Sequence, residues 1–188
     1  MLQLCASSLS DTHAVAGALA ALARSGDIIV LSGEMGAGKT AFAQGFGRAL
    51  GVTEPITSPT FTLVHSYDCG RLTLHHADLY RLDHTGEVAD LALAELAEFD
   101  GVVLVEWGEV ADNTLGDHLV VHLEADDLDD LDEPATDGGP TTDDEPAVDE
   151  AAEPVVDTGR RLIELSAVGP SWATRWAMIA ASCEEFAC

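Results

Sequence analysis

The sequence predicts an α/β fold in which a mainly parallel central sheet carries antiparallel hairpin additions and flanking helices. Residues 27–31, Asp-Ile-Ile-Val-Leu, have the pattern of a buried strand. Residues 33–40, Gly-Glu-Met-Gly-Ala-Gly-Lys-Thr, follow the phosphate-loop pattern G-x-x-x-x-G-K-[ST] and lead into a helical segment. A second apolar run, 102–105, has the pattern of a strand buried on both faces. A strand, a glycine-rich loop and a helix in this order indicate a P-loop NTPase-like fold.

A helix is expected on each side of the first of these strands. The earlier helix covers residues 11–24, where apolar residues recur at helical spacing, with Ser10 as its N-cap and Gly26 beyond its end. The later helix covers residues 41–50 and is closed by Gly51. Both helices are expected to cover the sheet.

A loop, a hairpin and a further helix are expected in the middle of the chain. Residues 53–60 contain prolines and hydroxyl side chains, which predict an irregular segment. Residues 61–67 and 71–77 alternate between apolar and polar side chains around a turn at 68–70, so they predict a hairpin. Residues 86–99 are expected to form the next helix.

The last part of the chain contains two predicted strands, 118–123 and 161–166, and a predicted terminal helix, 171–186. Between the strands, residues 124–159 are rich in Asp, Glu, Pro, Gly and Thr and poor in aromatic residues. Such a segment buries too little surface to offset its ordering entropy. We interpret it as a disordered acidic insertion, with a binding tail as the alternative, inside a single P-loop domain spanning residues 1–188.

The charge of the chain limits its direct partners. The net charge is −26, and residues 124–157 hold 15 of the 34 acidic residues. The remaining chain is acidic as well, with 19 acidic residues against 8 basic ones. Such a field opposes unaided binding to nucleic acid or to an anionic membrane. A role on RNA would therefore require a partner or a local patch.

Cysteine spacing and hydropathy indicate an intracellular compartment. The four cysteines, Cys5, Cys69, Cys183 and Cys188, form no C-x-x-C pair, so we expect reduced thiols and neither a disulfide framework nor a zinc site. The amino terminus lacks a basic segment followed by an apolar stretch, and no run of about 18 apolar residues occurs. We therefore expect a soluble, cytoplasmic protein without a membrane partner.

The glycine-rich loop is the strongest candidate for a functional site. Its glycines allow backbone N–H groups to point at phosphate oxygens, and the following helix adds its positive end. Lys39, the only lysine in the chain, is expected to neutralise the β- and γ-phosphates, and the Thr40 hydroxyl is expected to ligate Mg²⁺. A chance glycine-rich turn is the alternative. The residues expected to contact the nucleotide are Glu34, Met35, Gly36, Ala37, Gly38, Lys39, Thr40 and Ala41, with Thr57 and Thr60 from the next loop.

Two carboxylates follow predicted strands, where the acidic residue of a Walker B motif would lie. We expect one of Asp78 and Glu106 to contact Mg²⁺, directly or through water, and the other to organise the attacking water. Which residue has which role stays open, and a carboxylate that caps a helix is the alternative for either. The expected catalytic residues are thus Lys39, Asp78 and Glu106, and the expected metal ligands are Thr40, Asp78 and Glu106.

Other polar residues give weaker indications. Thr57 and Thr60 occupy the interval that carries a nucleotide-sensing switch loop in many P-loop enzymes, although local turn capping explains them almost as well. Trp107 is most simply a packing residue, but it could report nucleotide binding. The histidines do not form a ligand set with a known metal spacing, and those in strands are expected to face solvent or to make a structural hydrogen bond. The histidines considered as metal ligands are His65, His75, His76, His84, His118 and His122.

Four motifs together resemble the TsaE (YjeE) family in their order and spacing. They are residues 33–40, residues 57–64 with the sequence Thr-Ser-Pro-Thr-Phe-Thr-Leu-Val, residues 76–82 with the sequence His-Ala-Asp-Leu-Tyr-Arg-Leu, and residues 105–107 with the sequence Val-Glu-Trp. The similarity extends over roughly residues 10–123 and resumes weakly at 160–170.

The resemblance implies a small bacterial ATPase needed for making N6-threonylcarbamoyladenosine at position 37 of tRNAs that read codons beginning with A. It implies ATP and Mg²⁺ as cofactors, the transferase TsaD and its companion TsaB as partners, and contact with tRNA only through that complex. By the same resemblance, residues 36–40 would hold the phosphates, Thr40 and Glu106 would ligate Mg²⁺, Asp78 would assist hydrolysis, and residues 57–61 would form the switch. Weak hydrolysis without partners is expected.

Three alternatives are weighed against this expectation. A small-molecule kinase would use the same loop but usually adds arginines over the phosphates, and only Arg48, Arg71 and Arg81 lie in the middle of the chain. A GTPase commonly uses an N-K-x-D motif, and the chain has no second lysine. An assembly factor controlled by nucleotide occupancy, and not by hydrolysis, fits the same motifs.

Overall fold

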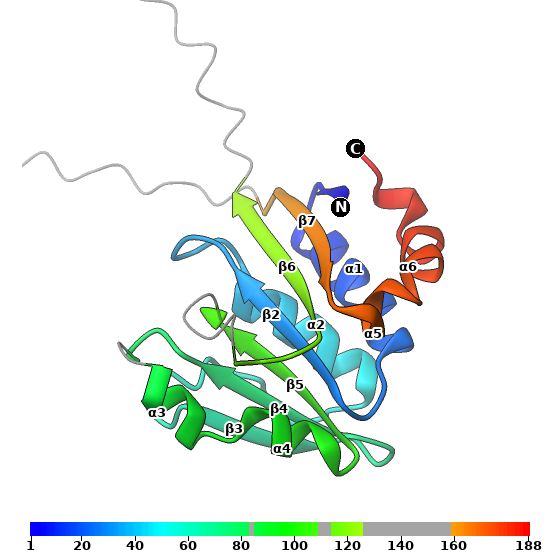
Figure 1. Ribbon diagram of the computed structural model, residues 1–188. Helices are drawn as coiled ribbons and strands as arrows, with labels where there is room; N and C mark the ends of the chain where they lie inside the picture. The colour runs from blue at the N-terminus through cyan, green and yellow to red at the C-terminus, as the bar shows by residue number, and fades with distance from the viewer. Residues whose placement is uncertain (83–84, 109–113, 126–158) are drawn as a thin grey trace, which may run out of the picture.

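The computed structural model describes residues 1–82, 85–108, 114–125 and 159–188 (Figure 1). Its described residues form one sheet of seven strands in the order β1-β7-β6-β2-β5-β4-β3. The strands are β1 (Leu2–Ala6), β2 (Asp27–Ser32), β3 (Val64–Asp68), β4 (Thr73–Asp78), β5 (Gly101–Glu106), β6 (His118–Ala125) and β7 (Arg161–Val168). The helices are α1 (Leu9–Leu22), α2 (Lys39–Leu50), α3 (Thr85–Asp90), α4 (Leu93–Glu98), α5 (Pro170–Ala173), α6 (Trp176–Ser182) and the 3₁₀ helix η3 (Glu184–Phe186).

The centre of the sheet is parallel and its edges are antiparallel. Strand β2 pairs in parallel with β5 and with β6, and β5 pairs in parallel with β4. The outer pairs, β3 with β4, β6 with β7 and β7 with β1, are antiparallel. This arrangement confirms the predicted α/β class, including the hairpin additions.

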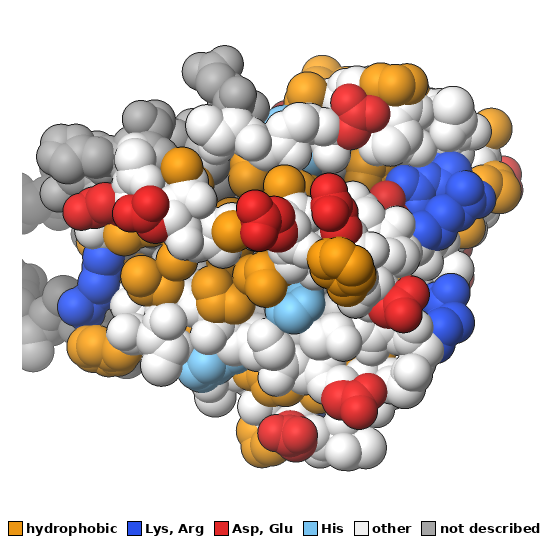
Figure 2. All heavy atoms as spheres, turned by 60° about the horizontal axis from the view of Figure 1, so that its bottom comes forward, with side chains coloured by type: hydrophobic (Ala, Val, Ile, Leu, Met, Phe, Trp, Pro, Cys, Tyr) orange, Lys and Arg blue, Asp and Glu red, His pale blue; other side chains and the backbone are white. Residues whose placement is uncertain are grey.

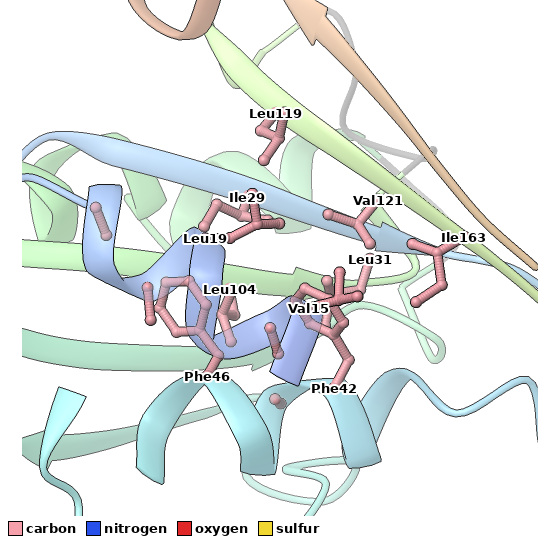
Figure 3. Packing of buried hydrophobic residues seen from close by; sticks show 14 of the residues in the cluster. Val15, Leu19, Ile29, Leu31, Phe42, Phe46, Leu104, Leu119, Val121 and Ile163 are labelled. Carbon is pink, nitrogen blue, oxygen red and sulfur yellow. The ribbon is translucent and has the colours of Figure 1, made fainter. Parts of the chain in front are cut away.

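Helices cover both faces of the sheet. Val15 and Leu19 of α1 and Phe42 and Phe46 of α2 pack against one face, where Figure 3 shows them beside apolar side chains of the central strands. Residues of α3 and α4 pack on the opposite face against alternate residues of β2 and β5. Because successive side chains of a strand point to opposite faces, the same central strands supply both cores. This double burial explains why residues 28–31 and 102–105 are apolar at every position.

Three N-terminal features differ from expectation. Strand β1 was not predicted, although its residues 3–6 alternate between exposed and buried positions as an edge strand should. Helix α1 begins two residues early because Ser8, and not Ser10, accepts the hydrogen bond from the Asp11 N–H. Helix α2 likewise begins at Lys39, so the expected start at residue 41 is late by two positions.

The helix expected over residues 86–99 is divided into α3 and α4. Ala92 lies between them in the left-handed conformation, with φ of 49°. Val88 and Leu93 are both buried against the sheet, yet they are five positions apart, a spacing that an uninterrupted helix would place on different faces. The break lets both side chains reach the core.

The helix expected over residues 171–186 is also divided, into α5, α6 and η3. The break falls at Arg175, whose guanidinium donates to both carboxylate oxygens of Asp27 at 2.7 and 2.6 Å. Both side chains are almost fully buried, with 3% and 6% of their surface exposed. Trp172 and Ile179 are buried in the same cluster as α1, and Figure 1 places α6 beside that helix. The path of the terminal segment is therefore determined by this ion pair and by core packing.

The expectation of four reduced thiols is wrong for two of them. Cys5 and Cys188 form a disulfide although 183 positions separate them in the sequence. A backbone bridge between Leu4 and Ala187 brings β1 and the C-terminal residues together. The spacing of the cysteines in the sequence does not predict this proximity. Cys69 and Cys183 are free thiols, and burial, aided by the charge of Glu185, raises the pKa of Cys183 to about 11.

The acidic character of the chain extends to the folded surface. On the face shown in Figure 2, Asp and Glu side chains are spread between hydrophobic patches, whereas Lys and Arg side chains lie near the margins of the view. Of the predicted insertion, Glu124 and Ala125 belong to β6, and residues 126–158 lie outside the described residues. None of the helices in the described ranges has both the length and the apolar character needed to cross a bilayer.

Candidate nucleotide-binding site

The glycine-rich loop joins the end of β2 to the start of α2. Gly33, Gly36 and Gly38 have positive φ angles of 126°, 84° and 105°, which L side chains rarely adopt. At Gly33 a Cβ would lie 2.1 Å from the Leu123 carbonyl oxygen, so any side chain there would clash with β6. Among the described residues, Gly38 at the N-cap of α2 supplies no side-chain cap, so backbone N–H groups lie at the positive end of this 12-residue helix. Such an end is suited to a phosphate anion.

Arg161 holds the loop from its outer side. Its Nε donates to the Ala37 carbonyl at 2.7 Å, and one terminal nitrogen lies 3.4 Å from the Gly36 carbonyl. The side chain is buried, although it begins β7 directly after the acidic stretch. These bonds fix carbonyl groups of the loop, which in turn restricts where the intervening N–H groups can point. Arg161 was not predicted as a site residue. The sequence shows only that it is a basic residue at the start of a predicted strand.

Lys39 is buried at the start of α2 and lies over Trp107. Its Nζ donates to the carbonyls of Gly33 and Glu34 at 2.7 and 2.8 Å and lies 3.8 Å from the centroid of the Trp107 ring. Trp107 in turn contacts Tyr80, with ring centroids 5.1 Å apart. Trp107, for which packing was the simplest expectation, is therefore a direct neighbour of the loop lysine, in a cation–π arrangement.

Asp78 and Glu106 are adjacent because of the strand register. They end β4 and β5, and the parallel pairing places the two residues directly opposite each other. Each is 3% exposed. The structure thus brings together two carboxylates that are 28 positions apart in the sequence, at the carboxyl end of the sheet beside the loop.

Glu106 is coupled to the phosphate loop. Its Oε1 accepts a hydrogen bond from the Thr40 hydroxyl at 2.9 Å. The same oxygen lies 2.8 Å from Nε2 of His76, a fully buried histidine. Of the two outcomes expected for strand histidines, His76 makes a hydrogen bond and does not face solvent. Its partner was not predicted, although His76 and Asp78 are two positions apart on one strand and therefore share a face.

Asp78 is coupled instead to the loop that follows α2. Its Oδ2 accepts hydrogen bonds from the hydroxyls of Ser58 and Thr60, both at 2.8 Å, and its Oδ1 accepts one from the Tyr80 N–H at 2.9 Å. The two hydroxyls lie 2.7 Å apart. Thr57, one position earlier, is exposed and makes none of these bonds. Ser58, which lies within the expected switch segment 57–61, therefore contacts Asp78 together with Thr60.

These side chains surround a cavity of about 390 Å³. Of the expected residues, it brings together Met35, Gly36, Gly38, Lys39, Thr40, Ala41, Thr60, Asp78 and Glu106, and it adds Ser58, Tyr80 and Trp107. Glu34, Ala37 and Thr57 do not line it. Lys39 is the one basic side chain among the residues described as lining this cavity.

A second cavity of about 360 Å³ lies on the other side of the loop. It shares Gly36, Gly38 and Ala41 with the first cavity. Its remaining walls come from the start of α1 and from the region before β7, namely Ser8, Leu9, Thr12, Gly159 and Arg161. Two hollows thus meet at the phosphate loop.

The donor set near the loop suits a magnesium ion. Within the described ranges, no group of three or more His, Cys, Asp and Glu side chains is arranged to hold a metal alone. Mg²⁺ usually takes one or two protein oxygens and completes its shell with water and substrate phosphates. Thr40 and Glu106 offer one hydroxyl and one carboxylate oxygen within hydrogen-bond distance of each other. Their chemistry therefore fits Mg²⁺ and would not suit a metal that requires nitrogen or sulfur ligands.

The fold and the loop together define a P-loop NTPase-like, nucleotide-binding α/β protein. Residues 6–132 match the family model described as "Threonylcarbamoyl adenosine biosynthesis protein TsaE". The chain belongs to this family, whose members take part in threonylcarbamoyladenosine biosynthesis on tRNA.

Individual relatives agree with the family assignment. The TsaE protein of Bacillus subtilis is 44% identical over 105 residues, which cover 56% of this chain and 65% of that protein. The TsaE protein of Treponema pallidum is 41% identical over 113 residues, covering 60% and 83% of the two chains. The crystal structure of Bacillus subtilis YdiB matches with a TM-score of 0.65 and 28% identity over 98% of this chain and 94% of that one. The chain thus spans slightly less than two thirds of its Bacillus subtilis TsaE relative.

Proposed function

We propose that residues 1–188 act as one P-loop ATPase domain that supports formation of N6-threonylcarbamoyladenosine at position 37 of tRNAs reading codons that begin with A. The observation that carries the proposal is the contact between Thr40 and Glu106 beside Lys39, in a chain of the TsaE family. The domain would work in the cytoplasm with the TsaD–TsaB transferase complex. The strongly acidic surface supports contact with tRNA only through that complex.

The phosphates would lie against the loop backbone and the first turn of α2, where the positive end of the helix favours an anion. The Lys39 ammonium lies beside the carbonyls of Gly33 and Glu34, from where it would neutralise the β- and γ-phosphates. The nucleoside would occupy the second cavity, because that cavity adjoins the same loop glycines and opens toward the start of α1. The phosphate-binding set would comprise Glu34, Met35, Gly36, Ala37, Gly38, Lys39, Thr40 and Ala41.

Thr40 and Glu106 are proposed to hold Mg²⁺. Bound Mg²⁺ would neutralise charge on the phosphates during phosphoryl transfer. Glu106 is the better candidate for the direct ligand, because it contacts the Thr40 hydroxyl whereas Asp78 does not. Asp78 is proposed to ligate the ion through water or to orient the attacking water.

Asp78 would also report nucleotide occupancy to the loop that follows α2. Its hydrogen bonds to Ser58 and Thr60 tie that loop to the site. A γ-phosphate that competes for the same hydroxyls would release or reorder the loop, as in a switch segment. Thr57 and Thr60 keep their proposed contacts with nucleotide, Thr57 only after such a rearrangement.

Partner binding is expected to complete the site. The residues around the cavity include exposed apolar side chains, with Met35 73% and Tyr80 51% exposed, and Phe61 nearby is 86% exposed. Exposed apolar groups at a cavity mouth are typical of an interaction surface. We propose that TsaD–TsaB covers them, excludes water and raises a weak basal ATPase rate.

Replacing Glu106 with glutamine tests the metal role. The variant keeps the shape of the side chain and removes its charge, so Mg²⁺-dependent ATP hydrolysis should fall on the order of 10²-fold, the usual effect of losing one preorganised electrostatic group. Nucleotide affinity in EDTA should change less than about twofold, because the phosphate loop is unaltered. Steady-state hydrolysis and calorimetry measure the two quantities.

The matched control is Glu98→Gln, which removes one negative charge from an exposed position on α4. It should hydrolyse ATP at the wild-type rate. Equal rates in wild type, Glu106→Gln and Glu98→Gln would contradict the proposed metal site.

The family role is tested by ATP hydrolysis and tRNA modification in the presence of the TsaD–TsaB pair. Stimulated hydrolysis with multiple-turnover modification supports the proposal. Full modification by Glu106→Gln despite lost hydrolysis would favour the occupancy-controlled assembly factor. ATP binding with no response to the pair would favour a small-molecule kinase, which the scarcity of basic side chains at the described cavity makes less suitable.

The acidic segment is expected to be dispensable for nucleotide binding. Ala125 and Arg161 are paired Cα partners in β6 and β7, so deleting residues 126–158 leaves Gly159-Arg160 as a two-residue connection. Gly159 already has a positive φ of 71°, as the first position of a type II′ turn requires. We expect the affinity for an ATP analogue, measured by calorimetry, to stay within about twofold of wild type, because strand pairing and Arg161 are retained. A loss of tenfold or more would show that the segment belongs to the site.

A further inference from the structure

His76 is a buried histidine in the strand that carries Asp78. Its side chain is fully buried, and it pairs across the sheet with Leu104 of β5. Leu74 of the same strand packs in the cluster that contains α1 and α2, whereas Ala77 packs in the opposite cluster. By strand alternation, His76 therefore points to the face covered by α2.

The polar contacts of this ring are directed at one group. Nε2 lies 2.8 Å from Glu106 Oε1, and among the described residues Nδ1 has no hydrogen-bond partner. A carboxylate oxygen can only accept, so Nε2 carries the hydrogen in this contact. Burying a polar ring with one unsatisfied nitrogen is costly, and the stability of the sheet does not require it. The contact with Glu106 is what distinguishes this side chain from an apolar residue of similar size.

Glu106 is held at one oxygen from two sides. Thr40 and His76 both donate to Oε1, from α2 and from β4. Within the described chain no donor contacts the other oxygen, Oε2. Two donors on one oxygen fix both the rotation and the tilt of a carboxylate, and they leave its second oxygen for another ligand.

We infer that His76 is a positioning residue that orients the Glu106 carboxylate so that it can receive a divalent cation beside Thr40. The inference rests on the proposed function, because Glu106 is a metal ligand only if the site binds Mg²⁺ with nucleotide. Hydrogen bonds from outer residues to metal-binding groups commonly change metal affinity by about 10- to 100-fold. His76 lines neither of the two cavities at the loop, so its effect would pass through Glu106.

The test compares His76→Leu, His76→Gln and His75→Leu. Leucine removes the donor, whereas the glutamine amide can place an N–H close to the position of Nε2. His75 is the neighbouring residue on the opposite face, where it contacts Ser66 and not Glu106, so His75→Leu controls for loss of a buried histidine from β4. The dissociation constant of a non-hydrolysable ATP analogue is measured by calorimetry at a series of free Mg²⁺ concentrations and in EDTA. Hydrolysis is followed over the same Mg²⁺ range.

For His76→Leu, the Mg²⁺ concentration that gives half of the effect on analogue affinity should rise by about 10- to 100-fold, with affinity in EDTA unchanged. His76→Gln should recover most of this loss, and His75→Leu should match wild type. A wild-type Mg²⁺ response in His76→Leu, or equal losses in the leucine variants at positions 75 and 76, would overturn the inference. If wild type itself binds analogue without any Mg²⁺ response and hydrolyses no ATP, the proposed function fails instead.

Discussion

Lys39→Ala is expected to abolish measurable nucleotide binding. The Lys39 ammonium is buried at the phosphate loop, and it is the one basic side chain among the described residues that line the larger cavity. Removing it leaves the triphosphate beside the carboxylates of Asp78 and Glu106 without the ammonium that would offset part of this negative charge. The loss in affinity should be at least on the order of 10²-fold, and hydrolysis should disappear with it. Calorimetric titration with ATP and Mg²⁺ measures the effect.

Arg71→Ala is the matched control for this change. It also removes one positive charge, but from an exposed position next to the turn between β3 and β4, outside that cavity. It should bind ATP as tightly as wild type. Comparable affinities of Lys39→Ala and wild type would refute the phosphate-binding role of the loop.

Replacing Arg175 with leucine should lower the free energy of unfolding by about 3–5 kcal/mol, since it leaves a buried carboxylate without its partner. Asp27 is 5% exposed, and its two oxygens both accept hydrogen bonds from the arginine. The same guanidinium also donates to the Leu22 carbonyl, so the substitution loosens the end of α1 as well. Urea unfolding followed by circular dichroism gives the change in stability.

Two further variants separate the ion pair from simple loss of an arginine. Arg71→Leu, at the exposed position used above, should change stability by less than about 0.5 kcal/mol. The double variant Asp27→Leu with Arg175→Leu should regain a large part of the loss, because replacing a whole buried pair with apolar residues is often neutral. An Arg175→Leu variant as stable as Arg71→Leu would show that the pair contributes nothing.

The central fold could be predicted because its determinants are local. The apolar run of β2, the three loop glycines and the helical spacing of α2 all lie within about two dozen consecutive residues, where periodicity and turn chemistry are informative. The predicted α/β fold class was confirmed because these determinants are local. Asp78 and Glu106 were recognised as strand-end carboxylates by the same local reading, although their adjacency depends on a register that pairs them across β4 and β5.

The remaining features depend on contacts between distant segments. His76 and Arg161 acquire their contacts from residues 30 and 124 positions away, and no spacing rule indicates such pairs. The terminal helix is interrupted at Arg175, which contacts Asp27. Here a tertiary contact overrides helical propensity. The pairing of Cys5 with Cys188 required the knowledge that β1 lies beside the C-terminal residues.

The bond between Cys5 and Cys188 makes a covalent ring of the chain between these residues. A protease that cuts once inside a ring opens it and releases nothing. A cut between residues 126 and 158 would therefore leave a two-chain molecule in which β6 and β7 stay paired and Arg161 stays attached to the loop. With both thiols reduced, packing, hydrogen bonds and the ion pair between Arg175 and Asp27 would retain the shorter fragment. In an oxidising medium, such a cut would therefore change neither the apparent molecular mass nor the activity of the protein. It would be detected only after reduction and denaturation.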